Sequence, residues 1–73
     1  MTAEEWLSAF ASEIGIDAPD EETTGELLEL AATAAHSSER IAAPIACYMT
    51  GIAGKSVADA RAAADRVKAD DGT

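Results

Sequence analysis

The side chains that could do chemistry are few, and three of them fall within twelve positions. His36, Arg40 and Cys47 supply an imidazole, a guanidinium and a thiol. His36 and Arg40 could flank a pocket for an anionic group, and a Cys paired with a His is a pattern of thiol catalysis. Each residue also has a structural role, because polar side chains satisfy free carbonyls at helix ends and a Cys inside an apolar helix packs as a small hydrophobic residue. We expect the structural roles to prevail.

Metal binding has little support in the sequence. His36 and Cys47 are the only residues of their types, and their spacing of eleven matches no structural zinc site. The acidic segment 17–22 lacks the alternating ligands and central glycine of a calcium-binding EF-hand loop. We therefore expect no metal, no cofactor and no catalytic residue, and we do not expect an enzyme.

Charge is distributed unevenly along an acidic chain of net charge −9. Residues 1–36 contain nine acidic residues and no Lys or Arg, whereas residues 37–73 contain five acidic residues and five Lys or Arg. Nucleic acids and anionic membranes attract basic surfaces, so neither is an expected partner. The acidic half either keeps the chain soluble, which is the interpretation we favour, or attracts a basic protein partner.

Two features favour a cytoplasmic protein. Cys47 has no second Cys for an intramolecular disulfide, and the acidic start of the chain does not resemble a secretory signal. The longest uncharged run, Ile41–Gly54, has 14 residues and contains Pro and Gly, whereas a membrane span needs roughly 20 apolar residues.

The material for a hydrophobic core is scarce. Alanine supplies 18 of the 35 hydrophobic residues, and Ile, Leu, Val and Phe together supply 12 of 73. Either short helices pack closely through Ala and Gly, or apolar surface is buried against a second copy or a partner. We favour the first alternative, so a monomer or a weak homodimer is expected.

Capping patterns and hydrophobic periodicity predict four helices. Thr2 with Glu5 opens a helix over about 3–14, which Gly15 ends, and Thr23 with Glu26 opens a second over about 24–37. Pro44 suits the first turn of a third helix, 43–54, which Gly54 ends. Ser56 with Asp59 opens the fourth, 57–69, and residues 70–73 are expected to form a frayed tail.

The third helix contains no charge and has two different sides. Its bulky side includes Ile45, Met49 and Ile52, whereas small residues, Gly51 among them, form the other. A helix without a polar face is expected to be surrounded by protein, and Gly51 is expected to allow close approach of another helix. The sequence thus predicts residues 1–73 to be one compact, all-α four-helix domain with the uncharged third helix innermost.

Three aromatic residues remain to be placed. Phe10 is expected in the core. Trp6 and Tyr48 either cover a small core, which we favour, or lie at the surface, where Trp and Tyr often anchor protein interfaces.

The chain resembles a family of small actinobacterial helical domains of unknown function. The similarity covers nearly the whole chain and includes Trp6, the Leu-rich second helix, the turn from His36 to Arg40, Ala42-Ala43-Pro44, and Gly51 with Ala53-Gly54. Such domains occur alone or attached to proteins resembling the molybdopterin-guanine dinucleotide biosynthesis nucleotidyltransferase. The resemblance implies a link to molybdenum-cofactor biosynthesis or delivery, and it implies no catalytic or nucleotide-binding residue in this chain.

Three functional hypotheses follow. The first, which we prefer, is a non-enzymatic accessory or interaction domain for a protein partner, for which the resemblance suggests a molybdenum-cofactor or molybdoenzyme component. The second is a small-anion-binding domain that uses His36 and Arg40 at the turn between the second and third helices. The third is a structural module that completes its thin core by homodimerisation.

Overall fold

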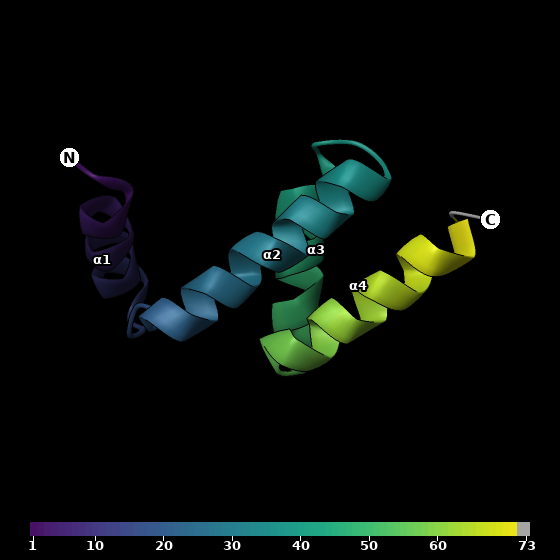
Figure 1. The fold of residues 1–73 in the computed structure, drawn as a ribbon. Helices are drawn as coiled ribbons and strands as arrows, with labels where there is room; N and C mark the ends of the chain where they lie inside the picture. The colour runs from purple at the N-terminus through teal and green to yellow at the C-terminus, as the bar shows by residue number, and fades with distance from the viewer. Residues whose placement is uncertain (72–73) are drawn as a thin grey trace.

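The computed structural model describes the backbone of residues 1–71 and the side chains of residues 1–68. It contains four helices in the order α1 (Ala3–Ile14), α2 (Glu21–Ser37), α3 (Ala42–Ala53) and α4 (Val57–Asp71). No strand occurs in residues 1–71, so the predicted all-α, four-helix class is confirmed. The molecule measures 42 × 24 × 19 Å, and α1 lies beyond the N-terminal end of α2, away from α3 and α4 (Figure 1).

The limits of α1 follow the sequence prediction. The Glu5 amide donates to Thr2 Oγ1 at 3.1 Å and the Thr2 amide donates to Glu5 Oε1 at 2.8 Å, which completes the predicted capping box. The hydrogen bonds from Thr2 lower the pKa of the Glu5 carboxyl, because they favour its charged form. Gly15 ends the helix in the left-handed region, at φ 78°.

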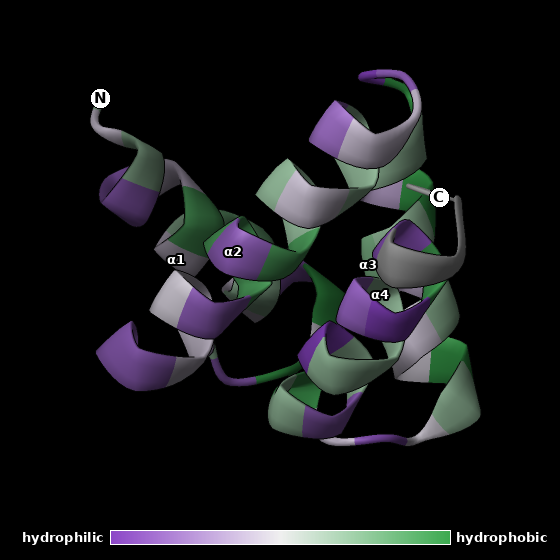
Figure 2. Cartoon of the chain, turned by 45° about the vertical axis from the view of Figure 1, so that its right-hand side comes forward, coloured by the Kyte–Doolittle hydropathy of each residue, from purple (hydrophilic) through white to green (hydrophobic). Residues whose placement is uncertain are grey.

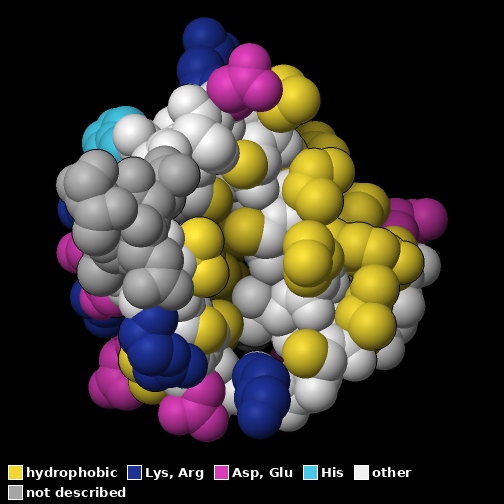
Figure 3. Space-filling model, turned by 90° about the vertical axis from the view of Figure 1, so that its right-hand side faces the viewer, with side chains coloured by type: hydrophobic (Ala, Val, Ile, Leu, Met, Phe, Trp, Pro, Cys, Tyr) yellow, Lys and Arg dark blue, Asp and Glu magenta, His cyan; other side chains and the backbone are white. Residues whose placement is uncertain are grey.

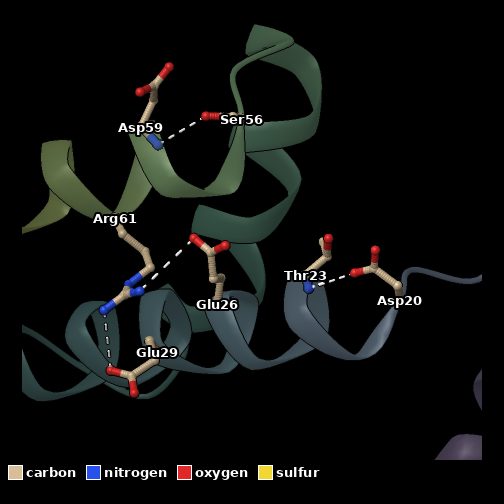
Figure 4. Close-up of polar contacts among 7 residues, drawn as sticks. All are labelled: Asp20, Thr23, Glu26, Glu29, Ser56, Asp59 and Arg61. Atoms are coloured by element: carbon tan, nitrogen blue, oxygen red, sulfur yellow. Dashed lines mark hydrogen bonds and ion pairs between the residues drawn. The ribbon is translucent and has the colours of Figure 1, made fainter.

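Helix α2 begins three residues before its predicted start. Asp20, rather than Thr23, is the N-cap: its carboxylate accepts a hydrogen bond from the Thr23 amide at 2.8 Å (Figure 4), which also lowers the pKa of Asp20. Glu21 and Glu22 therefore lie in the first turn, where the helix dipole favours negative charge. The predicted helix start at about residue 24 leaves these two acids outside the helix.

The remaining helix ends agree with the prediction, with two differences. Pro44 lies in the first turn of α3, and Gly54 ends that helix at φ 66°. Ser56 Oγ accepts a hydrogen bond from the Asp59 amide at 3.1 Å and caps α4 (Figure 4). Helix α3 begins and ends one residue earlier than predicted, and α4 continues to Asp71, so the predicted tail is helical at residues 70 and 71. Residues 72 and 73 lie outside the described part of the chain.

The central helix is α2, and the prediction that α3 is innermost is wrong. The extensive helix contacts are those of α2 with α3 and of α2 with α4. In α3, no residue is buried, although Ala42, Ala43, Ala46, Cys47 and Thr50 are half-buried. The longer α2 supplies Leu30, which is the only large side chain buried among residues 1–68. The physical reason is that these small residues of α3 face the rest of the protein, whereas its bulky residues face the solvent.

The predicted close contact at Gly51 is also absent. A methyl group added at this glycine would meet no atom within 4 Å. The interior of a helix favours alanine over glycine because glycine loses more backbone entropy on folding. Nothing in the described structure therefore requires glycine at this position.

We accordingly predict that Gly51→Ala stabilises the domain. Its free energy of unfolding should rise by about 1 kcal/mol and its melting midpoint by about 4–8 °C. Gly54→Ala is the matched control and should destabilise, because Gly54 occupies the left-handed region and its methyl group would be strained there. Thermal unfolding of both variants measures the two effects. A lower midpoint for Gly51→Ala would mean that another molecule approaches α3 at this point.

Candidate interaction surfaces

The first candidate surface is the outer side of α3. Five bulky side chains lie there and are 57–73% exposed: Ile41, Ile45, Tyr48, Met49 and Ile52. Each of them has another of the five three or four residues away, so they form one stripe along the helix. Figure 3 shows a band of hydrophobic side chains on this side of the molecule, with charged side chains at its margins. An exposed apolar stripe is a candidate surface for binding another molecule.

The second candidate surface is on α1. The rings of Trp6 and Phe10 stack with centroids 5.0 Å apart and an interplanar angle of 17°. Trp6 is 53% exposed and Phe10 is 46% exposed. The prediction that Phe10 lies in the core is therefore wrong, and Trp6 does not cover a core. Leu7 and Ile14 are exposed beside them. Among the described residues, α1 makes no extensive contact with another helix.

Two apolar hollows accompany these surfaces. One, of about 510 Å³, lies between α1, the following loop and α2, and its lining includes Leu7, Pro19 and Leu28. The other, of about 500 Å³, lies between α3 and α4 with α2 as its floor, and its lining includes Ala46, Met49 and Val67. The first hollow also has Glu4 and Glu21 in its lining, whereas no charged residue lines the second.

His36 and Arg40 do not form a common pocket. Both side chains are exposed, His36 in the last turn of α2 and Arg40 in the turn that precedes α3. Among the described residues, neither side chain makes a hydrogen bond or an ion pair, and neither lines the two hollows. The expected structural role of these side chains, a bond to free carbonyls at a helix end, is therefore not found among the described residues.

The cation that joins two helices is Arg61, which the sequence analysis did not select. Its guanidinium on α4 lies 3.6 Å from Glu29 and 4.0 Å from Glu26, both on α2 (Figure 4). Arg61 is partly exposed and Glu29 is largely exposed, so the pair contributes little to stability. The side of α4 that carries Arg61 faces α2. Figure 2 shows hydrophilic segments on α1, α2 and α4, the helices that carry the charges.

The chemistry-bearing residues are dispersed. Cys47 is half-buried on the side of α3 that faces α2, and His36 is exposed at the end of α2. Within the described residues, no group of three or more His, Cys, Asp or Glu side chains is placed to hold a metal ion. No helix in residues 1–71 combines the length and apolar character needed to cross a membrane.

The exposed surface of the chain is large for its mass. Its solvent-accessible area is 5702 Å². A folded monomer of 7.5 kDa exposes on average about 4,250 Å². The excess, about 1,450 Å², is larger than the roughly 800 Å² that each partner buries in a standard protein interface. The excess is thus enough for one protein contact of standard size.

Fold and surface together define a small all-α domain built around α2, with apolar helix faces that its own chain leaves open. A family model described as "Domain of unknown function (DUF6457)" matches residues 1–71, and the chain belongs to this family. No curated protein and no solved structure matches the chain.

Proposed function

We propose that this domain is a non-enzymatic accessory module that binds a protein partner through α1. The observation that carries the proposal is the exposed Trp6–Phe10 stack on a helix that makes no extensive contact with the rest of the chain. Trp and Tyr are frequent anchors of protein interfaces, and aromatic side chains in general bury a large area on binding. A stacked pair on an open helix is well suited to enter an apolar pocket of the partner.

The length of α1 supports the same proposal. Isolated helices shorter than about 12–15 residues are marginally stable in water, and α1 has 12. Its capping box and Gly15 cap favour the helix locally, and Ala11 is buried, but the large apolar side chains Trp6, Leu7, Phe10 and Ile14 stay 43–54% exposed. Contact with a partner supplies the missing burial.

Charge indicates a basic partner surface. Glu4, Glu5 and Glu13 lie on α1, and residues 1–36 contain no Lys or Arg. Acids around an apolar contact accelerate association with a basic surface and disfavour acidic ones. The resemblance noted above suggests a partner in molybdenum-cofactor biosynthesis or delivery, acting in the cytoplasm. We take the cofactor nucleotidyltransferase as the first protein to test.

A non-enzymatic role is supported by the placement of His36 and Cys47. One is exposed at the end of α2, and the other faces α2 from within α3. A thiol nucleophile needs a base within hydrogen-bond reach, and Cys47 donates no hydrogen bond to a His in the described structure. The small-anion hypothesis gains no support from the exposed positions of His36 and Arg40.

The test uses the fluorescence of Trp6, the only tryptophan. Titration with purified molybdopterin-guanine dinucleotide nucleotidyltransferase should shift the emission of Trp6 to shorter wavelength as its ring is buried. Phe10→Ala should weaken binding by about 30-fold or more, which corresponds to about 2 kcal/mol. The matched control is Ile16→Ala, an exposed position in the loop after α1.

The outcomes separate the parts of the proposal. No binding would reject the nucleotidyltransferase as partner. Binding that Phe10→Ala leaves unchanged would reject α1 as the contact surface. Binding that strengthens as the salt concentration rises would contradict a basic partner surface, because salt screens attraction between opposite charges.

A further inference from the structure

We infer that the outer side of α3 is a homodimer interface, in which it packs antiparallel against α3 of a second copy. This inference concerns a surface other than α1 and does not rest on the proposed partner. It starts from the α3 seam, defined as Ile41, Ile45, Tyr48 and Ile52. These residues succeed one another at spacings of four, three and four, which is the spacing of residues that pack against another helix in a coiled coil. The occupant that fits the seam is therefore a helix.

The spacing of the seam residues is the same from either end of the helix, and all four residues are apolar or aromatic. In an antiparallel pair related by a two-fold axis, Ile41 lies opposite Ile52 of the second copy, and Ile45 lies opposite Tyr48 of the second copy. A two-fold interface requires such self-complementarity, because each contact occurs twice with the two residues exchanged. The four seam residues thus meet apolar partners in a single register.

Charge permits this contact despite the net charge of −9. Residues 41–54 contain no charged side chain, and nine of the fourteen acids lie in residues 1–36. Two copies can therefore approach through α3 without burying a like-charge pair.

The exposed area also fits a second copy. A stable interface of standard size buries roughly 800 Å² per partner, and the chain exposes about 1,450 Å² more than an average monomer of its mass. The five α3 side chains are the most exposed continuous stripe of large apolar residues, and Val67 on α4 is exposed as well. Dimerisation through α3 covers this side and leaves the Trp6–Phe10 stack on α1 accessible.

Sedimentation equilibrium of the full chain and its variants tests the inference. The wild type should approach twice 7.5 kDa as its concentration is raised to about 1 mM, where even weak complexes associate. Ile45→Glu should raise the dissociation constant at least about a hundredfold, because two seam contacts per dimer acquire a charge. Leu28→Glu is the matched control: it also places a charge on an exposed apolar residue, but on α2. The control should remain dimeric, and both variants should keep their helical circular dichroism.

A mixture of two single variants tests the register. Ile45→Glu and Tyr48→Lys should each be monomeric alone and should form a heterodimer when mixed, because position 45 of one copy faces position 48 of the other. A wild-type mass that stays at 7.5 kDa up to about 1 mM would overturn the inference. So would a dimer that survives Ile45→Glu or that is lost in Phe10→Glu, which would place the contact on α1. Because the partner titration depends on Phe10 and not on Ile45, failure of one proposal is distinguishable from failure of the other.

Discussion

Leu30→Ala is expected to lower the free energy of unfolding by about 2–5 kcal/mol, the usual cost of removing a buried leucine side chain. Leu30 is 3% exposed and lies on α2, which both α3 and α4 contact. A domain of this length has a total stability of about 4–11 kcal/mol. Loss of this one side chain therefore removes a large part of the stability, and urea unfolding followed by circular dichroism should show a largely unfolded variant at 37 °C.

Leu28→Ala is the matched control for this experiment. It is the same substitution two positions earlier on the same helix, where Leu28 is 66% exposed. Its free energy of unfolding should differ from the wild type by less than about 0.5 kcal/mol, as for most surface substitutions. Equal losses for Leu28→Ala and Leu30→Ala would mean that the core does not lie on the side of α2 that faces α3 and α4.

Ser8→Pro and Ala32→Pro are expected to have very different effects. Both positions are exposed and lie inside a helix, Ser8 in α1 and Ala32 in α2. Proline in a helix interior costs about 3 kcal/mol or more, since it removes a hydrogen bond and clashes with the preceding turn. Ala32→Pro should unfold the whole domain, because α3 and α4 both pack on α2. Ser8→Pro should disrupt α1 alone.

Thermal unfolding measures the difference. With Ser8→Pro, the midpoint for the other three helices should shift by less than about 4 °C, because α1 contributes little packing to them. With Ala32→Pro, no cooperative transition should remain. The same Ser8→Pro variant should also lose the shift in Trp6 fluorescence on addition of the partner. A midpoint lowered equally by the two variants would contradict the independence of α1.

The parts of the fold that depend on local signals were predictable from the sequence. Thr2 with Glu5, Ser56 with Asp59, and the two left-handed glycines act within four residues of their own helix ends, so the four helices and most of their limits were found. The start of α2 was misplaced because Asp20 and Thr23 are both good N-caps. The sequence thus offers two possible N-caps for one helix. A start at Asp20 places Glu21 and Glu22 in the first turn of α2.

The position of α3 was not predictable in the same way. Hydrophobic periodicity shows that a helix has two different sides, but it does not tell which of them faces the chain's own core. The absence of charge in residues 41–54 is equally consistent with burial inside one chain and with burial between two chains. The structure shows the small side toward α2 and the α3 seam toward the solvent.

For the candidate site residues too, the sequence indicates the chemistry of a side chain but not its place in the fold. His36 and Arg40 were selected for their chemistry, and the structure leaves both exposed and apart from the hollows. Trp6 and Tyr48 were selected as aromatics that could anchor an interface, and both are exposed on separate helices. Arg61 was missed because its contacts with Glu26 and Glu29 join two helices about thirty residues apart in the sequence, and spacing within one helix cannot reveal them.

Hydrogen exchange of the full chain, read by mass spectrometry on peptides from each helix, tests the central claim that α2 is the core and that α1 and α3 present open faces. We predict the slowest exchange in α2, the fastest in α1, and an intermediate rate in α3 that slows as the protein concentration is raised. Strongest protection of α3 at low concentration, or protection of α1 equal to that of α2, would contradict the account.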